Sequence, residues 1–384
     1  MSLQRFFHFL LPLSMGLTME RGLGGEVVYA RNFTLDSVRD VTRLRIFSGK
    51  DTAVYALCPA EKCQGLGEGA VAIKIPLRRI IALANIHLGF LEALDRRSNL
   101  VGVDRSEFVF DSSLRVLGKS GQWKAVGSGS DLDWERATTS RPDAILISGL
   151  PEGDARVRAK ARSLGIPILI TGEWLESHPL GRAEWIKVYG ALYGETARAD
   201  SLFSNISHSY DSLRAMVLLG KSPRCFAFAG AGWKGSWHIA GGASFVAQLF
   251  RDAGIAYAWD GDTHTGSLTL SLESVLEKAR DADLWLNPGS ARSLSELERM
   301  EPRAATFKAF RSGMVFQSDA KILTNGANDY WENGPVRPDL ILEDLIHIAN
   351  DELNKKPGNY FRRLTPLPSP TTVGEGSGVR DLSR

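Results

Sequence analysis

Two blocks of the sequence alternate short apolar runs with segments that are compatible with helices, and the stretch between them has no proline from Leu180 to Leu219. Nearly all-apolar strands separated by helices are typical of a parallel sheet that is covered on both faces. The helix–strand–Gly arrangement at 135–149 recurs at 272–289. The sequence therefore predicts two α/β lobes of like topology, each with a doubly wound sheet. The runs expected to form strands include 80–84, 100–103, 142–149 and 166–170 in the first block, and 224–229 and 255–258 in the second.

The stretch between the two blocks, residues 179–221, is predicted to be a long helix that joins the lobes. Apolar side chains recur at near-helical spacing from Trp185 to Leu213, and Gly194 marks a candidate kink. At ~1.5 Å of rise per residue, such a helix extends on the order of 55 Å, which is enough to bridge two domains. The predicted fold is thus α/β, with two doubly wound α/β lobes joined by a long α-helix.

The segments outside the lobes are assigned from their composition. Residues 1–25 place Arg5 before an apolar stretch with the length of a secretory signal, and the alternative is an amphipathic N-terminal helix of a cytoplasmic protein. Residues 355–384 are rich in Pro, Gly and Ser and are predicted to be disordered. Between these ends we expect a first lobe with a β extension over 26–178, the linker over 179–221, a second lobe over 222–330 and a C-terminal helix over 331–354.

The three cysteines bear on the compartment of the protein. Cys58 and Cys63 have no second pair that would complete a zinc ribbon. If the protein is exported, a local disulfide between these two residues is plausible. Cys225 opens an apolar run and is interpreted as a small buried hydrophobic residue rather than a nucleophile.

Charge and motif content argue against several classes of function. The chain has 46 Lys and Arg against 44 Asp and Glu, and this net charge of +2 argues against a nucleic-acid partner. No apolar run approaches the roughly 18 residues that a membrane-spanning helix needs. The sequence has no His-Glu-x-x-His motif, no Gly-x-Ser-x-Gly elbow and no histidine pair at i, i+4 spacing. A nucleophile elbow or a metal site built from a local motif is therefore not visible in the sequence.

One glycine-rich segment offers an alternative from another class. Gly230–Gly235 matches the G-x-G-x-x-G pattern directly after an apolar strand, and Asp260 follows a later strand, near where a ribose-binding acid would lie. Against this interpretation, the expected helix starts only near Gly241, whereas a dinucleotide site needs the helix to start within the glycines. Trp233 is also bulky where the backbone must approach a pyrophosphate. An NAD-dependent cytoplasmic enzyme is therefore the less favoured alternative.

Aromatic side chains gather in segments that follow predicted strands. Loops at strand ends are where open α/β sheets bind ligands, and aromatic rings there offer large contact areas to a bulky ligand. The alternative is that several of these rings only fill the core between the lobes. The residues in question are Trp233, Trp237, His238, Trp259, Tyr330 and Trp331.

Residues 173–200, which begin Glu-Trp-Leu-Glu-Ser-His-Pro-Leu-Gly-Arg, resemble the linker-helix signature of one protein family. This family comprises the substrate-binding proteins of ABC importers for iron complexes, haem and cobalamin. The resemblance covers roughly residues 30–352, and the combination of its parts is specific although each part alone is weak. The further matching segments, in family order, are 141–147, 236–254, 282–287 and 330–345.

The resemblance implies a protein of the helical-linker class, with a ligand held in the cleft between two lobes. It implies an exported, soluble, periplasmic monomer that is not an enzyme and has no catalytic residue, no cofactor and no metal site. Such a protein delivers a ferric siderophore or haem-like complex to an ABC permease in the inner membrane. Cobalamin is the alternative ligand. A surface carboxylate on each lobe would dock on the permease, and the matching positions are Glu152 and Glu296. The implied cleft positions are His87, Glu176, Arg182, Trp233, Trp237, His238, Trp259, Tyr330 and Trp331.

Overall fold

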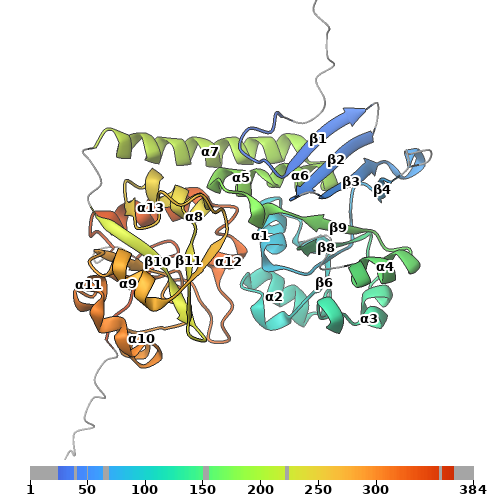
Figure 1. Cartoon of the computed structure of the whole chain (residues 1–384). Coiled ribbons are helices and arrows are strands. Elements are labelled where there is room, and N and C mark those ends of the chain that lie inside the picture. The colour runs from blue at the N-terminus through green and yellow to red at the C-terminus, as the bar shows by residue number, and fades with distance from the viewer. Residues whose placement is uncertain are drawn as a thin grey trace, which may run out of the picture.

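The computed structural model describes residues 25–38, 41–49, 51–63, 69–149, 155–220, 225–353 and 357–366. Two α/β lobes lie side by side, and α7 (Thr196–Leu218) runs along one side of both (Figure 1). This arrangement confirms the predicted fold class. Most of the predicted signal segment 1–25 and the end of the predicted tail, 367–384, lie outside the described residues.

The first lobe is built on a five-stranded parallel sheet in the order β7-β6-β5-β8-β9. Three of its strands, Ile80–Ala82, Leu100–Val103 and Ile168–Thr171, are buried along their whole length, because they consist mostly of branched apolar residues that pack on both faces. The strands are β5 (Ile80–Ala82), β6 (Leu100–Val103), β7 (Lys124–Ala125), β8 (Ala144–Ser148) and β9 (Ile168–Thr171). The helices are α1 (Asn85–Ala93), α2 (Ser112–Lys119), α3 (Trp134–Thr139) and α4 (Ala155–Ser163).

A separate four-stranded sheet forms the β extension of the first lobe. Three of its strands pair antiparallel, and β4 pairs parallel to β3. Cys58, at the end of β3, forms a disulfide with Cys63, and their Cα atoms are 5.4 Å apart. The pairing expected for an exported protein is therefore present. The strands are β1 (Phe33–Val38), β2 (Val41–Ser48), β3 (Asp51–Cys58) and β4 (Val71–Lys74).

The linker consists of three helices rather than the single helix expected over 179–221. They are α5 (Pro179–Glu184), α6 (Ile186–Tyr193) and α7. The break before α7 falls at Gly194, whose φ of 71° ends α6 in the left-handed conformation that glycine adopts without steric cost. The chain then turns, and only the 23-residue α7 bridges the lobes.

The second lobe contains a mixed sheet whose parallel strands are β12, β10, β14 and β15. β11 and β13 extend it on one side, and β16 pairs antiparallel to β15 on the other. The strands are β10 (Phe226–Trp233), β11 (Ser236–Ala240), β12 (Ala256–Tyr257), β13 (Ser267–Leu270), β14 (Leu284–Leu286), β15 (Val315–Gln317) and β16 (Arg362–Arg363). The helices are α8 (Phe245–Asp252), α9 (Leu272–Ala279), α10 (Leu294–Met300), α11 (Lys308–Arg311), α12 (Asp329–Glu332) and α13 (Pro338–Ala349).

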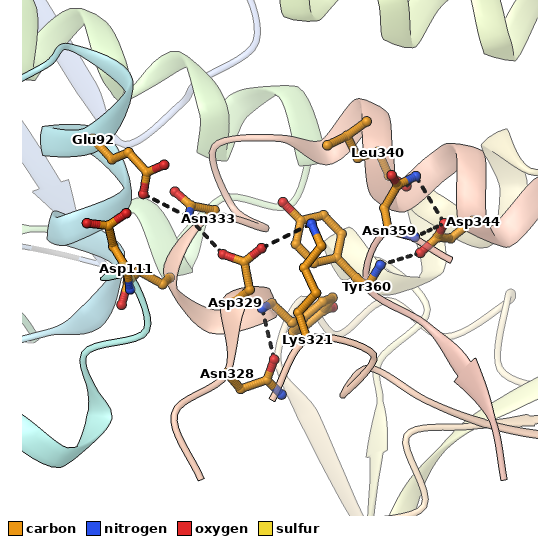
Figure 2. Close-up of polar contacts among 12 residues, drawn as sticks. Glu92, Asp111, Lys321, Asn328, Asp329, Asn333, Leu340, Asp344, Asn359 and Tyr360 are labelled. Carbon is orange, nitrogen blue, oxygen red and sulfur yellow. Dashed lines mark hydrogen bonds and ion pairs between the residues drawn. The ribbon is translucent and has the colours of Figure 1, made fainter. Parts of the chain in front are cut away.

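The prediction of a disordered tail is wrong for residues 357–366, which belong to the second lobe. Tyr360, Phe361 and Leu364 are buried in its core. The carboxylate of Asp344, on α13, accepts the backbone N–H groups of Asn359, Tyr360 and Phe361 at 2.6–2.9 Å (Figure 2). Composition marked the segment as polar, but its three apolar residues and this buried carboxylate hold it against the sheet.

Candidate functional site

The two lobes meet where α12 of the second lobe lies on α1 of the first (Figure 1). Gly89 makes this contact possible, because a Cβ atom at that position would stand 2.1 Å from the carbonyl oxygen of Glu332. The backbone of α12 therefore rests directly on the backbone of α1. We call this contact, together with the side chains around it, the seam between the lobes.

A buried carboxylate crosses the seam. Glu332 has no exposed surface, and its side chain accepts the backbone N–H groups of Phe110 at 2.7 Å and of Asp111 at 2.9 Å. Both donors belong to the first lobe, and Asp111 also caps the N-terminus of α2. Burial raises the pKa of Glu332 to about 7, although the two N–H groups oppose this shift. The side chain thus joins the lobes with a group that titrates near neutral pH.

A second polar contact crosses the seam beside Glu332 (Figure 2). The side-chain amide of Asn333 donates to Glu92 of α1 at 3.1 Å and to Asp329 of α12 at 2.8 Å. Lys321 lies 3.4 Å from the carboxylate of Asp329. A cavity of about 430 Å³ borders these groups and is lined by α1, α7 and the start of α13. The seam is therefore polar as well as closely packed.

His87, Glu173 and Arg182 are among the side chains that keep one buried atom without a hydrogen-bond partner in the described residues. These atoms are Nε2 of His87, Oε2 of Glu173 and Nε of Arg182. Nδ1 of His87 contacts the Tyr189 hydroxyl at 2.6 Å, and Glu173 accepts from Ser148 at 2.6 Å. Burial lowers the pKa of His87 to about 4, partly opposed by the charge of Glu173, so the imidazole is neutral at pH 7. The cluster therefore offers neutral and charged groups to a polar ligand.

Arg182 connects this cluster to the second lobe. Its guanidinium lies 4.2 Å from the ring centre of Phe245, at the start of α8. Burial lowers the pKa of Arg182, while Tyr330 of the second lobe and the carboxylates of Glu173 and Glu176 raise it, so these three side chains lie near its guanidinium. An arginine in this position can stack on an aromatic face and donate to a carboxylate.

The structure separates the predicted cleft residues into exposed and buried sets. Trp233 is 65% exposed and Trp331 58% exposed, and His238 is also exposed. Tyr330 is mostly buried, and its ring packs edge-on against Trp331 and Tyr360. Of the predicted set, Trp331 is the large side chain that projects from α12 at the seam.

Three of the predicted cleft residues are corrected by the structure. Trp237 packs against Trp285 and Phe307 in the core of the second lobe, and Trp259 is buried beside Tyr257. Neither ring is accessible to a ligand. The third residue, Glu176, is 2% exposed, and its carboxylate is hydrogen-bonded within the protein.

The carboxylate of Glu176 holds the N-terminal segment instead of a ligand. It accepts the backbone N–H groups of Arg31 at 2.8 Å and Asn32 at 3.0 Å, and Nε1 of Trp185 at 2.9 Å. His87 is also fully buried, and only its unpartnered Nε2 remains available. These contacts join residues that are far apart in the sequence.

Sequence reasoning missed Glu173 and Trp174, which follow β9 at its carboxyl end. Trp174 is 42% exposed and Glu173 is buried in the polar cluster. The available signal was their position directly after a buried apolar strand, where parallel sheets bind ligands. They stood at the start of the linker signature and were interpreted only as part of it.

The two predicted docking carboxylates are placed differently. Glu152 lies outside the described residues. Glu296 lies on α10, where it accepts the backbone N–H of Arg292 at 2.9 Å, and its side chain is 34% exposed. Its docking role stays a prediction.

The Gly230–Gly235 segment forms a β-hairpin rather than a dinucleotide-binding loop. β10 and β11 pair antiparallel across a two-residue turn, Lys234-Gly235, whose φ angles are 49° and 82°. The next helix, α8, begins only at Phe245. The glycines therefore serve the hairpin, and no helix N-terminus faces them.

In the part of the chain that the structure describes, no group of three or more His, Cys, Asp or Glu side chains is arranged to hold a metal ion. Within the same residues, every helix is too short or too polar to cross a membrane.

Comparisons with known proteins agree with this architecture. The family model described as "Periplasmic binding protein" matches residues 80–322. An uncharacterized lipoprotein of Methanocaldococcus jannaschii is 28% identical over 316 residues, which cover 79% of this chain and 72% of the lipoprotein.

Two solved structures share the fold. A periplasmic vitamin B12 binding protein of Vibrio cholerae has a TM-score of 0.51 at 17% identity, covering 73% of this chain and 99% of its own. A periplasmic heme binding protein of Pseudomonas aeruginosa has a TM-score of 0.52 at 19% identity, covering 71% of this chain and 92% of its own. The family match, the two lobes and the bridging helix confirm the resemblance seen in the sequence, and this chain belongs to the periplasmic binding protein family.

Proposed function

We propose that this protein is an exported substrate-binding protein that captures an iron complex between its lobes. The ligand is a ferric siderophore or a haem-like compound, and the protein delivers it as a monomer to an ABC permease in the inner membrane. Family membership supports a location outside the cytoplasm, and a relative described as a lipoprotein agrees with it. The net charge of +2 supports a partner other than nucleic acid.

The observation that carries the proposal is the exposed Trp331 on α12, the helix through which the second lobe contacts the first. Trp331 projects from α12, its neighbour Tyr330 is within reach of the charge of Arg182, and Arg182 keeps an unpartnered Nε. A large, rigid iron complex with peripheral carboxylates or carbonyls fits this combination. Its flat surface stacks on the indole ring, and its polar edge accepts from the guanidinium.

Cobalamin is the second candidate ligand, because it has the same size, rigidity and peripheral carbonyl groups. The fold shared with the vitamin B12 binding protein of Vibrio cholerae supports keeping it in the test. The NAD-dependent alternative loses its main support, since the glycines that suggested it form the turn and strands of a hairpin.

Tryptophan fluorescence tests the ligand class. We expect saturable quenching when the protein is titrated with a ferric hydroxamate siderophore, haem or cyanocobalamin, and none with NAD. Trp331→Ala should weaken binding of the active ligand about tenfold, because it removes one stacking surface of about 1.4 kcal/mol. Leu218→Ala, which removes another exposed apolar side chain at the far end of α7, is the matched control and should leave the affinity unchanged.

Two outcomes contradict the proposal. Saturable binding of NAD alone would assign the chain to another class of function. Equal effects of Trp331→Ala and Leu218→Ala on affinity would place the ligand away from the seam.

Uptake measurements test the docking role of Glu152. We expect Glu152→Arg to leave ligand affinity intact and to impair import in cells that depend on this protein, because it reverses the charge of the side chain that would dock on the permease. Glu135→Arg changes an exposed carboxylate of the same lobe by the same charge and serves as the control. A large loss of affinity in Glu152→Arg, or equal import by both variants, would contradict a docking role.

A further inference from the structure

The parallel sheet of the first lobe has one crevice at its carboxyl edge. β6 and β7 lie on one side of β5, and β8 and β9 lie on the other, so the strand order reverses between β5 and β8. Open α/β sheets bind ligands outside the carboxyl ends of the strands at such a reversal. His87 lies in the first turn of α1, shortly after β5, and Ser148 ends β8. The topology therefore brings these two residues to the same crevice.

A buried carboxylate joins them there. Glu173, which follows β9, is 1% exposed, and its Oε1 accepts from the Ser148 hydroxyl at 2.6 Å. The charge of Glu173 acts on the fully buried His87 and on Arg182 of α5. His87, Glu173 and Arg182 thus form one cluster, although they come from α1, the end of β9 and the linker. We call this set the polar cluster.

Each member of the polar cluster keeps one buried atom that bonds to nothing in the described part of the chain. These atoms are Nε2 of His87, Oε2 of Glu173 and Nε of Arg182. The carboxylate and the guanidinium carry opposite charges and influence each other, yet Oε2 and Nε do not bond to one another. A buried polar atom without a partner destabilises the fold. Three such atoms at a ligand-binding crevice indicate that a ligand supplies the missing partners.

The hydrogen-bonding capacity of the three atoms defines the chemical group that completes them. Nε of Arg182 is a donor, and Oε2 of Glu173 is an acceptor. The imidazole of His87 is neutral at pH 7, and when its Nδ1 donates to the Tyr189 hydroxyl, its Nε2 is a second acceptor. A primary carboxamide has one carbonyl oxygen and two N–H groups, so it matches one donor and two acceptors. A carboxylate has no donor and would place its charge against Glu173.

The second lobe covers the polar cluster. The guanidinium of Arg182 lies 4.2 Å from the ring centre of Phe245 on α8, and Tyr330 of α12 is near it. α12 also rests on α1, which carries His87. Separation of the lobes therefore uncovers the cluster, and their closure encloses a ligand group together with it.

We infer that His87, Glu173 and Arg182 bind a carboxamide group of the transported metal complex and discriminate against complexes whose periphery carries carboxylates. The inference rests on the proposed function and narrows its ligand to an amide-bearing siderophore, corrinoid or haem derivative. The amide carbonyl accepts from Arg182, and the N–H groups donate to Glu173 and His87. An ionised carboxylate in the same place loses its hydration and is repelled by the buried charge of Glu173.

Pairs of metal complexes test the inference, with affinity measured by tryptophan quenching at neutral pH. The pairs are haem diamide with haem, cyanocobalamin with its hydrolysed carboxylic acid derivative, and ferrioxamine E with ferric citrate. In a pair that binds, we expect the amide-bearing member to bind about 100-fold more tightly than the carboxylate-bearing one. Glu173→Gln should reduce this ratio to less than about tenfold, because glutamine removes the buried charge and offers a donor to a carboxylate. Glu107→Gln alters an exposed carboxylate of the same lobe and should leave the ratio unchanged.

The ratio in the wild type decides the matter even if Glu173→Gln does not fold. Equal affinity for the two members of a pair, or tighter binding of the carboxylate-bearing one, would overturn the inference. An unchanged ratio in a folded Glu173→Gln would also overturn it, because other groups would then discriminate and ordered water would satisfy the buried atoms of the polar cluster. If no member of any pair binds, the proposed function fails and this inference fails with it, which distinguishes the two failures.

Discussion

Gly89→Ala is expected to lower the free energy of unfolding by about 2–3 kcal/mol and to loosen the contact between the lobes. The added Cβ would stand 2.1 Å from the carbonyl oxygen of Glu332, and a backbone atom cannot rotate away as a side chain can. The sign of the effect is informative, because Gly→Ala inside a helix ordinarily stabilises by about 1 kcal/mol. Only the close approach of α12 turns this ordinary stabilisation into a loss of stability.

Urea unfolding measures the loss of stability, and small-angle X-ray scattering measures whether the lobes separate. The control is Gly261→Ala, since a Cβ at that position has nothing within 4 Å. We expect a larger radius of gyration for Gly89→Ala than for the control. If the Gly89 variant is as stable and as compact as the wild type, the lobes in solution do not meet through α1 and α12.

The lobes themselves could be predicted from the sequence because their strands are continuous apolar runs. The runs at 80–84 and 166–170 became β5 and β9, since no other arrangement buries both faces of such segments. The linker was only partly predictable. Helical spacing continues across 179–221, and the break depends on Gly194, which the pattern marked only as a candidate kink.

The candidate site was predicted less well, because exposure depends on contacts between distant residues. Trp237 and Trp331 were both predicted to face the cleft, yet one lies among core rings and the other projects from α12. Glu176 was expected in the cleft because nothing local shows that Arg31 and Asn32, more than 140 residues earlier, donate to it. A carboxylate or an indole can be assigned to a site only after its partners are known.

The stability of the protein is expected to depend on pH through Glu332. The pKa of this carboxyl is about 7 in the folded protein, compared with 4.5 as its ordinary value. Between these values the folded state holds a proton that the unfolded state has lost, so this group stabilises the fold at pH 5 and loses that effect as pH rises toward 8. The full shift corresponds to about 3 kcal/mol. His87 acts in the opposite direction, because its pKa is lowered to about 4 and its contribution is lost as pH falls below about 6.

Comparison of the wild type with Glu332→Gln separates these opposing effects, because His87 is present in both proteins. Glutamine resembles the protonated carboxyl and cannot ionise. The stability of the variant relative to the wild type should therefore rise by about 2.5 kcal/mol between pH 5 and pH 8 in urea unfolding. Glu92 and Asp111 face Glu332 and further disfavour its charge, and neither is altered by the substitution. Glu277→Gln on α9 is exposed and should follow the wild type at every pH. Parallel curves for wild type and Glu332→Gln would mean that the carboxylate is hydrated in solution, and a hydrated Glu332 cannot bridge α12 to the backbone of Phe110 and Asp111.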